Sequence, residues 1–466
     1  MTITNEPDTS TAAVPARVAA LRATFESGVT RSLEWRQEQL DALIRFCDEQ
    51  EEALIEAIVS DLGRPWLEAY AADIGTTAAE IKHLRKNVEG WMKPKKAKLP
   101  LTSLPAKGRI YPEPLGVALV IAPWNYPVQL LLEPIAAALA AGNTVAAKPS
   151  ELSPATSAAI AAKLGDYIDP GVVAVFEGDV PVSTALLEQR FDHIFFTGST
   201  RVGKVVMEAA AKHLTPVTLE LGGKSPCIVD DSVDLEVAAH RIAWGKWLNA
   251  GQTCIAPDYV LVSANRRDAL VDELRSTIDE FYGDDPQGTK DFGRVVNSSQ
   301  HERLVGYLDG QNVAIGGDHD AATKYLAPTV VVDPPLDSEL MSEEIFGPIL
   351  PIVAVEDLGA AIAFVNERPK PLALYVFAED EDAVDRVLGE TSSGGACVNH
   401  TLLHITPPDL PFGGVGPSGM GRYHGASSFE TFSNMKSVLN KPLKGENSLL
   451  YPPYKGWKQK LVKKAL

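Results

Sequence analysis

Short runs of hydrophobic residues alternate with alanine- and leucine-rich stretches along much of the chain. Residues 116–122 (GVALVIA) form a β-branched apolar run, which predicts a buried strand. Residues 128–142 (VQLLLEPIAAALAAG) predict a helix that ends on glycine, and residues 143–151 (NTVAAKPSE) return to strand character. Together these segments predict one strand–helix–strand unit with parallel strands.

The alternation continues in two series. The first predicts strands at VVAVFEG, HIFFTG and VTLEL, with helices near 154–168 and 200–213. The second predicts strands at CIVD, YVLVS, TVVVD, ILPIVAVE and LALYVFAED, with helices near 234–248, 266–282 and 357–366. We therefore expect two α/β domains with parallel sheets, meeting near Gly222 and Gly223, after a largely helical region from residue 15 to about 93.

Composition and charge narrow the class of protein. The 466 residues are 45% hydrophobic and 22% charged, which suits two or three globular units. A net charge of -18 and a pI near 5.0 repel phosphate backbones, so no nucleic-acid partner is expected. The most apolar region, residues 116–147, is interrupted by three prolines, Asn125 and Glu133, so no membrane span is predicted.

The cysteines and the N-terminus indicate a reducing compartment. Cys47, Cys227, Cys254 and Cys397 are far apart and form no C-x-x-C pair, which predicts neither a disulfide framework nor a metal site. The N-terminus has no basic segment followed by an apolar core, so no signal peptide is predicted. We therefore expect a cytoplasmic protein.

The C-terminal segment has the opposite charge to the rest of the chain. Residues 436–466 contain eight lysines and one glutamate. Because no apolar stretch accompanies them, a solvated or subunit-packing tail is favoured over an anchor on an anionic surface.

Two glycine-rich stretches are candidates for a nucleotide loop. GGVGPSGMG (413–421) matches G-x-G-x-x-G, but the proline-rich HITPPDLP precedes it, so a surface turn is favoured. HIFFTGSTRVGK (193–204) instead runs from a strand through Gly198 into a helix containing Gly203. Lys148 and Glu151 follow a neighbouring strand, where they could bind a ribose. Glycines in such turns can also serve packing alone.

Three further stretches suggest covalent chemistry. Cys254, in NAGQTCIAP, follows a helix and a glycine turn, where a thiol can approach a substrate. Glu220, in LELGGKSP, ends a strand at the expected domain junction and could act as a general base. Asn125, in APWNYP, could donate to an oxyanion from a stiff turn. Each residue taken alone has a structural alternative: an inert cysteine, an ordinary carboxylate and a turn asparagine.

The order of the motifs resembles a known family. PWNYP, KPSE, FTGSTRVG, LELGGKSP, GQTC, EEIFGP and PFGGVGPSGMG occur in the order and at spacings like those of the NAD(P)-dependent aldehyde dehydrogenase superfamily. The short N-terminal region, with RIAWGKW, ETSSGG, SGMGRYHG and SFETFS, is most similar to the class 3 branch. The chain departs from many class 3 relatives at His400, where they often carry Asp, which affects any inference about the wall of the substrate pocket.

The resemblance implies an α/β fold with two Rossmann-like parallel-sheet α/β domains, one for the cofactor and one for catalysis, plus a small oligomerisation element. We expect the NAD(P)-binding domain to comprise residues 1–93 and 114–221, and the catalytic domain residues 222–408. The oligomerisation element would comprise residues 94–113 and 409–466. It implies a homodimer as well, with the C-terminal region in an isologous interface.

The resemblance also implies catalytic roles. Cys254 would attack the aldehyde carbonyl to form a thiohemiacetal, from which hydride can leave. Asn125 and the backbone N–H of Cys254 would hold the oxyanion. Glu220 would activate the water that hydrolyses the resulting thioester. Phe412 and Gly413, in the glycine-rich stretch, would approach substrate or cofactor.

A second set of residues is implied for the cofactor. Lys148 and Glu151 would hold the adenosine ribose, and Glu344 the nicotinamide ribose. The full set of cofactor-binding residues is Trp124, Lys148, Glu151, Gly198, Ser199, Gly203, Glu344 and Phe346. Because Glu151 would lose a hydrogen bond to the 2′-OH and face a dianion in NADP, NAD is expected to be preferred, with NADP possible.

Two rival functions are weighed against aldehyde oxidation to the acid. A CoA-acylating relative would transfer the acyl group to a thiol, but the presence of Glu220 disfavours it. A non-catalytic scaffold would have no need of Cys254 together with Glu220. The expected substrate is a medium- or long-chain aliphatic or aromatic aldehyde, and the sequence does not identify the physiological one.

Overall fold

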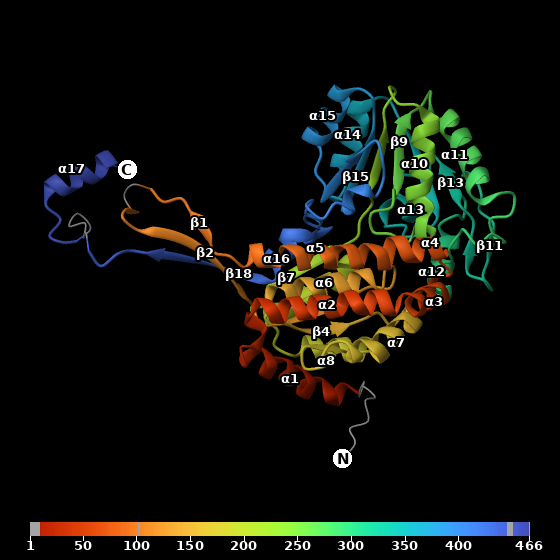
Figure 1. Cartoon of the computed structure of the whole chain (residues 1–466). Coiled ribbons are helices and arrows are strands. Elements are labelled where there is room, and N and C mark those ends of the chain that lie inside the picture. Colours follow the sequence, from red (N-terminus) through yellow and green to blue (C-terminus); the bar gives the residue numbers. More distant parts are fainter. Residues whose placement is uncertain (1–9, 101–102, 445–450, 466) are drawn as a thin grey trace, which may run out of the picture.

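The structure, a computed structural model, describes residues 10–100, 103–444 and 451–465. Figure 1 shows two lobes that meet at a junction and an arm of strands that extends away from them. The lower lobe is built on a six-stranded sheet, and the upper lobe on a seven-stranded sheet. This arrangement confirms the predicted α/β fold with two Rossmann-like parallel-sheet units.

The six-stranded sheet has the order β17-β7-β6-β3-β4-β5. Its strands are β3 (Val117–Ile121), β4 (Thr144–Lys148), β5 (Val173–Val175), β6 (His193–Gly198), β7 (Val217–Leu221) and β17 (Gly419–Met420). All neighbouring pairs are parallel except β17 with β7. Because these strands are buried on both faces, they are nearly continuous hydrophobic runs.

Helices cover both faces of this sheet. Ala118 and Val120 of β3 pack in the core formed with α2, α5 and α6, while Val117 and Leu119 pack on the opposite face with α1. The helices of this lobe are α1 (Val14–Glu26), α2 (Leu33–Glu49), α3 (Glu51–Leu62), α4 (Trp66–Ala69), α5 (Gly75–Trp91), α6 (Gln129–Ala141), α7 (Pro154–Lys163), α8 (Val180–Leu187) and α9 (Thr200–Ala211). The predicted helical N-terminal region therefore supplies helices to both faces of this sheet, α1 to one face and α2 and α5 to the other (Figure 1).

The seven-stranded sheet has the order β10-β13-β14-β9-β8-β15-β16 and is parallel except at β10. Its strands are β8 (Pro226–Val229), β9 (Tyr259–Ser263), β10 (Val313–Ile315), β13 (Thr329–Val332), β14 (Ile349–Val355), β15 (Ala373–Phe377) and β16 (Gly395–Val398). The helices of this lobe are α10 (Leu235–Trp247), α11 (Arg267–Tyr282), α12 (Ser298–Gly306), α13 (Glu339–Ser342), α14 (Leu358–Asn366) and α15 (Glu381–Glu390). A small pair, β11 (His319–Asp320) and β12 (Tyr325–Leu326), lies beside it.

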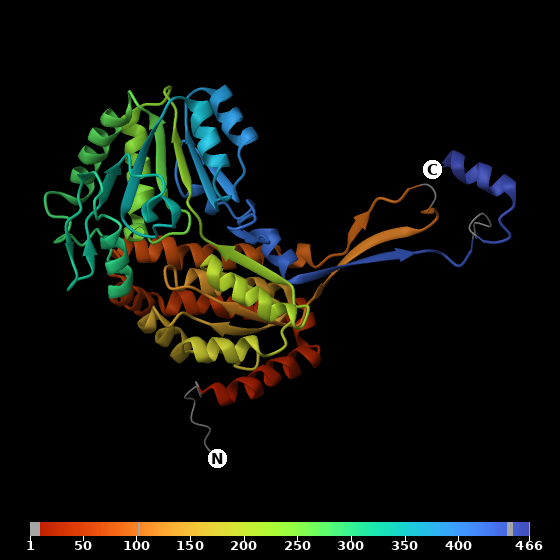
Figure 2. The same ribbon diagram turned by 180° about the vertical axis from the view of Figure 1, so that it is seen from behind.

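The arm is a three-stranded antiparallel sheet with the order β1-β2-β18. It comprises β1 (Lys95–Ala97), β2 (Lys107–Pro114) and β18 (Ser433–Asn440), and α17 (Gly456–Ala465) lies beyond its tip (Figures 1 and 2). Between β17 and β18, α16 (Gly425–Thr431) packs against α5 and α6 of the lower lobe. Residues 95–97, 107–114 and 433–440 thus lie side by side, while β17 and α16 belong spatially to the body.

Among the described residues, no helix is long and apolar enough to cross a membrane.

Candidate active site

Two cavities meet at Cys254, at the junction of the two lobes. The first has a volume of about 310 Å³ and the second about 230 Å³. The residues common to both are Leu130, Thr197, Glu220, Leu221 and Cys254. A molecule in either cavity can therefore reach the same thiol and the same carboxyl group.

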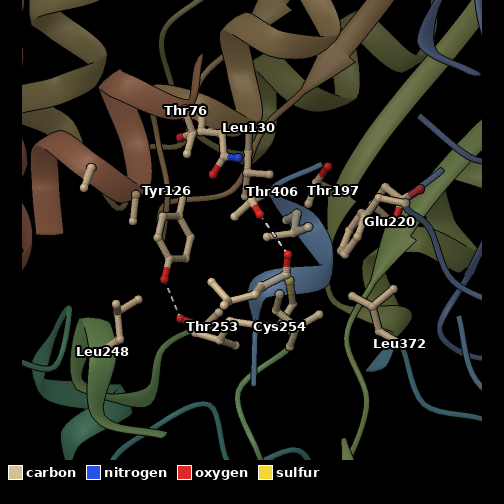
Figure 3. Close-up of a pocket in the computed structure, with 18 of the residues that line it drawn as sticks. Thr76, Tyr126, Leu130, Thr197, Glu220, Leu248, Thr253, Cys254, Leu372 and Thr406 are labelled. Carbon is tan, nitrogen blue, oxygen red and sulfur yellow. Dashed lines mark hydrogen bonds between the residues drawn. The ribbon is translucent and has the colours of Figure 1, made fainter. Parts of the chain in front are cut away.

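The first cavity has mainly hydrophobic walls (Figure 3). Its polar groups near the thiol include Thr253, whose hydroxyl lies 2.6 Å from the Tyr126 hydroxyl. The apolar walls consist of Leu67, Ala71, Ala72, Leu130, Trp244, Leu248, Ile255, Leu372, Leu402, Leu403, Ile405 and Phe412. Such walls favour an alkyl or aromatic substrate tail, because burial of apolar surface drives its binding.

The loop before Cys254 is held in one conformation by Gly251 and Gln252 of the GQTC motif. The loop follows α10 through a turn in which Asn249 and Ala250 both have φ of 52°. Gly251, with φ of 75°, lies so close to Gly347 O that any Cβ there would overlap it. The Gln252 side chain donates to Asn249 O and Arg294 O and accepts from the Val296 N–H. These contacts fix the position of the cysteine.

As a residue Cys254 is partly exposed, although its thiol lies among buried groups, whereas Cys47 and Cys227 are fully buried. Burial, together with the nearby Glu344 and Glu220 carboxyl groups, raises the pKa of Cys254 to about 12. The thiol is therefore protonated at neutral pH before a ligand enters. Hydrogen bonds from the backbone N–H groups of Cys254 and Ile255 lower this pKa, but by less.

Asn125 lies directly beside this loop. Its side-chain Nδ2 donates to Gln252 O at 3.1 Å, and its backbone oxygen accepts from Asn249 Nδ2 at 2.9 Å. The side chain is buried and lines the second cavity together with Cys254. An amide N–H₂ has two protons, so one remains for a ligand in that cavity.

Glu220 is the last residue but one of β7 and lines both cavities. The residue is 3% exposed, and neither carboxyl oxygen has a hydrogen-bond partner among the described residues. Burial raises its pKa well above the ordinary value, and Arg422 opposes this only in part. A buried, unpartnered carboxyl group of this kind is suited to proton transfer with a bound water or substrate.

The second cavity contains part of the predicted cofactor loop. Gly198 and Ser199 line it, and the Ser199 hydroxyl caps α9 by accepting from the Val202 N–H at 3.4 Å. Gly203 instead faces the sheet, since a Cβ there would lie 2.7 Å from Leu221 Cδ2. Close packing of helix on strand therefore accounts for this glycine in the structure.

Trp124, Glu344 and Phe346 line the same cavity. The Trp124 and Phe346 rings meet edge to face, with centroids 5.3 Å apart. Burial and the nearby Asp258 raise the pKa of Glu344 to about 8, and its Oε1 has no hydrogen-bond partner among the described residues. Any Cβ on Gly222 would overlap the Glu344 carboxyl group, so only glycine at this position leaves room for that group.

Lys148 and Glu151 form a pair beyond the end of β4. Lys148 Nζ donates to Pro149 O at 2.7 Å and to Glu151 Oε2 at 3.2 Å. The Lys148 side chain is buried, which lowers its pKa, while 42% of the Glu151 side chain is exposed. The structure does not bring the pair to Cys254: neither residue lines the two cavities that meet there.

The stretch GGVGPSGMG does not form a strand–turn–helix phosphate loop. Gly419 and Met420 pair antiparallel with β7, opposite Glu220 and Leu219. Phe412 lines the first cavity, and a Cβ on Gly413 would lie 2.8 Å from Glu220 Oε1. Gly416 and Pro417 form the predicted exposed turn, but the stretch as a whole is not a surface turn, because Gly413, Gly414 and Gly419 are buried against β7 and the active site.

Sequence reasoning missed several lining residues. Thr197 borders both cavities, and Gln300 of α12 borders the second. Tyr423 is buried in the wall of the first cavity, and its hydroxyl has no partner among the described residues. The position of Thr197, next to Gly198 at the end of a strand, could have indicated it. Within the described parts of the chain, no group of His, Cys, Asp and Glu is arranged to hold a metal ion.

Comparisons with known proteins point to one family. The family model described as "Aldehyde dehydrogenase family" matches residues 1–438. The mouse protein named aldehyde dehydrogenase family 3 member A2 is 49% identical over 439 residues, covering 94% of this chain and 91% of the relative. The dog protein named aldehyde dehydrogenase, dimeric NADP-preferring, is 47% identical over 442 residues, covering 94% of this chain and 97% of its own.

A solved structure is also similar over nearly its whole length. The substrate-bound state of Staphylococcus aureus AldH superposes with a TM-score of 0.94 at 45% identity. The match covers 97% of this chain and 99% of that chain.

Proposed function

Because this chain belongs to the aldehyde dehydrogenase family and oxidises aldehydes to carboxylic acids with NAD(P), we propose that Cys254 is its nucleophile. The observation that carries this proposal is that the apolar cavity and the second cavity meet at this thiol. The Cys254 thiol would pass its proton to a water, its sulfur would bond to the aldehyde carbon, and the carbonyl oxygen would become an oxyanion. The second proton of Asn125 Nδ2 and the Cys254 N–H would stabilise that charge.

Glu220 completes the proposed reaction. Loss of hydride from the thiohemiacetal carbon leaves a thioester on Cys254. Glu220, which lines both cavities, would take a proton from a water as that water attacks the thioester carbon. The carbon–sulfur bond then breaks and releases the carboxylic acid. Neither a scaffold role nor acyl transfer to CoA makes use of this carboxyl group.

The residues around the second cavity fit the cofactor. The unpartnered, buried Glu344 Oε1 suits a ribose hydroxyl donor, and Trp124 and Phe346 provide a ring-sized apolar wall. Bound there, NAD(P) supplies the hydride acceptor. Gly198 and Ser199 would form the loop on its path toward Lys148 and Glu151, which would hold the adenosine ribose, while Gly203 would support that loop by packing α9 on the sheet.

The finer properties of the enzyme follow from the same residues. We propose that NAD is preferred over NADP because of Glu151, although the dog relative is named NADP-preferring. We also propose a homodimer, which the word dimeric in that name supports. A cytoplasmic location remains a prediction, which cell fractionation tests.

The division of labour between Cys254 and Glu220 can be tested directly. With an aldehyde and NAD but no CoA, the wild-type protein should produce NADH steadily. Cys254→Ala should abolish NADH formation, whereas Glu220→Gln should give a burst of about one NADH per site and then stall, because the acyl-enzyme is no longer hydrolysed. Unaltered steady turnover of Glu220→Gln would remove Glu220 from the mechanism.

A further inference from the structure

A third cavity, of about 100 Å³, adjoins the apolar pocket. It shares four lining residues with that pocket, namely Thr76, Gln129, Ile405 and Thr406. Thr76 lies across the pocket from Cys254 in Figure 3. The small cavity therefore lies next to the part of the pocket where the far end of a substrate would sit.

The small cavity is acidic, in contrast to the apolar pocket. Its other lining residues are Ala79, Glu80, Glu133, Pro408 and His424. Glu80 comes from α5, Glu133 from α6, and His424 from the residue that precedes α16. Three elements thus converge to place two carboxyl groups and an imidazole around one small space.

Glu133 has an unused polar atom in this cavity. The residue is 3% exposed, and its Oε2 has no hydrogen-bond partner among the described residues. His424 Nε2, at 3.6 Å, is too distant for a hydrogen bond and is itself unpartnered within the described chain. A buried polar atom without a partner is costly, so a ligand that satisfies it gains the corresponding free energy.

The charges around the cavity favour a cation. Its described lining residues contain no lysine or arginine. Burial and the neighbouring Glu80 raise the pKa of Glu133 well above the ordinary value, while burial raises that of Glu80 to about 7 and lowers that of His424 to about 4. The shifts follow from the lack of a countercharge, which keeps Glu133 largely protonated near neutral pH. A bound ammonium group would supply that countercharge, so Glu133 would release its proton and bind the cation as a carboxylate.

We propose that this cavity is a subsite for an ammonium group at the far end of an aldehyde substrate. The carbon chain would fill the apolar pocket, the aldehyde would face Cys254, and the ammonium N–H would donate to Glu133 Oε2. This inference rests on the proposed function, since it presumes that Cys254 attacks the aldehyde. It adds an amino-aldehyde class to the alkyl and aromatic aldehydes that the hydrophobic walls favour.

The test compares matched substrates. ω-Dimethylamino alkanals cannot form imines with themselves, and each has an uncharged isostere in which a CH replaces the N–H⁺. We expect kcat/KM of the wild-type protein to favour the amino compound about tenfold or more at one chain length, where the nitrogen reaches Glu133. A preference for the uncharged isostere at every length would overturn the proposal.

Variants of the lining carboxyl groups identify the residue that causes the preference for the amino compound. Glu133→Gln should abolish the preference at that length while retaining oxidation of the uncharged aldehydes, and Glu80→Gln should weaken it. Glu89→Gln, an exposed position on the same helix as Glu80, makes the same change in net charge and should leave the ratio unaltered. If Glu133→Gln leaves the ratio of kcat/KM for the amino aldehyde and its uncharged isostere unchanged, Glu133 does not bind the ammonium group.

A binding measurement covers the case in which Glu133→Gln does not fold. An N,N-dimethylalkylamine of the matching length should inhibit oxidation of hexanal by the wild-type protein competitively with the aldehyde. It should inhibit at least tenfold more strongly than the isosteric branched alkane, and equal inhibition would count against the subsite. Failure of every uncharged aldehyde to be oxidised would instead contradict the proposed function, which separates the two outcomes.

Discussion

Burial sets the protonation states of the two reacting side chains, Cys254 and Glu220. A carboxyl group below its raised pKa is neutral and cannot accept a proton, so hydrolysis of the thioester should accelerate as Glu220 ionises. We predict that the steady-state rate at saturating aldehyde rises with pH through the neutral and alkaline range. Glu220→Gln should lower that rate roughly 10²- to 10⁴-fold and remove most of its pH dependence. Rapid-mixing absorbance of NADH separates the burst, which reports on Cys254, from the steady rate.

The raised pKa of Glu220 makes the rate rise with pH, but it makes the free energy of unfolding fall with pH. Since the folded-state pKa of Glu220 is raised, its contribution to stability is present at low pH and is lost as pH rises through that pKa. The free energy of unfolding of Glu220→Gln should therefore fall less steeply with rising pH than that of the wild type. Parallel curves from denaturant titrations at several pH values would indicate that the carboxyl group is not buried as described.

The pair Lys148 and Glu151 bears on the choice between NAD and NADP. Glu151 must give up a hydrogen bond and face a dianion when a 2′-phosphate replaces the ribose hydroxyl, but its partly exposed side chain is also paired with Lys148. We therefore expect kcat/KM to favour NAD by about 1 to 3 kcal/mol. Glu151→Gln should narrow the gap by improving the NADP reaction, while Glu188→Gln, exposed at the end of α8, serves as the control. A wild-type preference for NADP would place the adenosine ribose elsewhere.

At the scale of elements, the turn between α10 and Cys254 depends on Gly251. Its positive φ and its contact with Gly347 O leave no room for a methyl group. We predict that Gly251→Ala lowers the free energy of unfolding by at least about 1 to 3 kcal/mol and reduces kcat further, because the thiol moves with the loop. The control is Gly90→Ala, in the open last turn of α5, which should be neutral or slightly stabilising. Thermal melts and NADH kinetics on the two variants measure these losses. A Gly251→Ala enzyme with wild-type kinetics would show that Gly251 does not position the thiol.

Regular elements were predictable from the sequence where hydrophobic periodicity is strong. The strands at 117–121 and 193–198 and the helix at 129–141 were expected close to their observed positions. Short strands escaped prediction: β16 (Gly395–Val398) is only half buried, and β17 is defined by pairing with β7 from almost two hundred residues away. Such pairing leaves little signal in local sequence, because tertiary contacts determine it.

The candidate site was predictable in its residue types more than in its geometry. Motif order placed Cys254, Glu220 and Asn125 together, and all three border the cavities that meet at the thiol. Gly203 was expected in the cofactor loop but packs against Leu221, because one letter cannot distinguish a glycine needed for ligand approach from one needed for helix–strand packing. Tyr423 and Gln300 come from elements whose position over the site follows only from the fold.

At the scale of the whole molecule, the arm leaves apolar surface uncovered. Figure 2 shows it extending from the body, with α17 beyond its tip. Leu439 is 58% exposed, and on α17 Trp457 and Leu461 are 52% and 49% exposed. Because these two residues are four positions apart, they lie on the same face of the helix. Exposed apolar surface of this kind is typical of surfaces that pack against another chain.

Charge supports a second copy of this chain as the partner. Residues 436–466 carry a net +7 and the whole chain carries -18, so residues 1–435 carry -25. The basic segment 436–466 of one copy would attract the acidic body of the other across a two-fold axis, where each copy offers both surfaces. The charge distribution therefore favours subunit packing as the role of residues 436–466.

Removal of residues 441–466 tests this arrangement while leaving β18 intact. We predict that the full-length protein has twice its chain mass of 50.1 kDa in light scattering, and that the truncated protein is largely monomeric and less active. Since the attraction is partly electrostatic, higher ionic strength should weaken the dimer of a Trp457→Ala variant before that of the wild type. Gln459→Ala, on the same helix, is the matched control and should not change the association. A full-length monomer whose activity survives the truncation would show that the arm makes no functional contact with a second subunit.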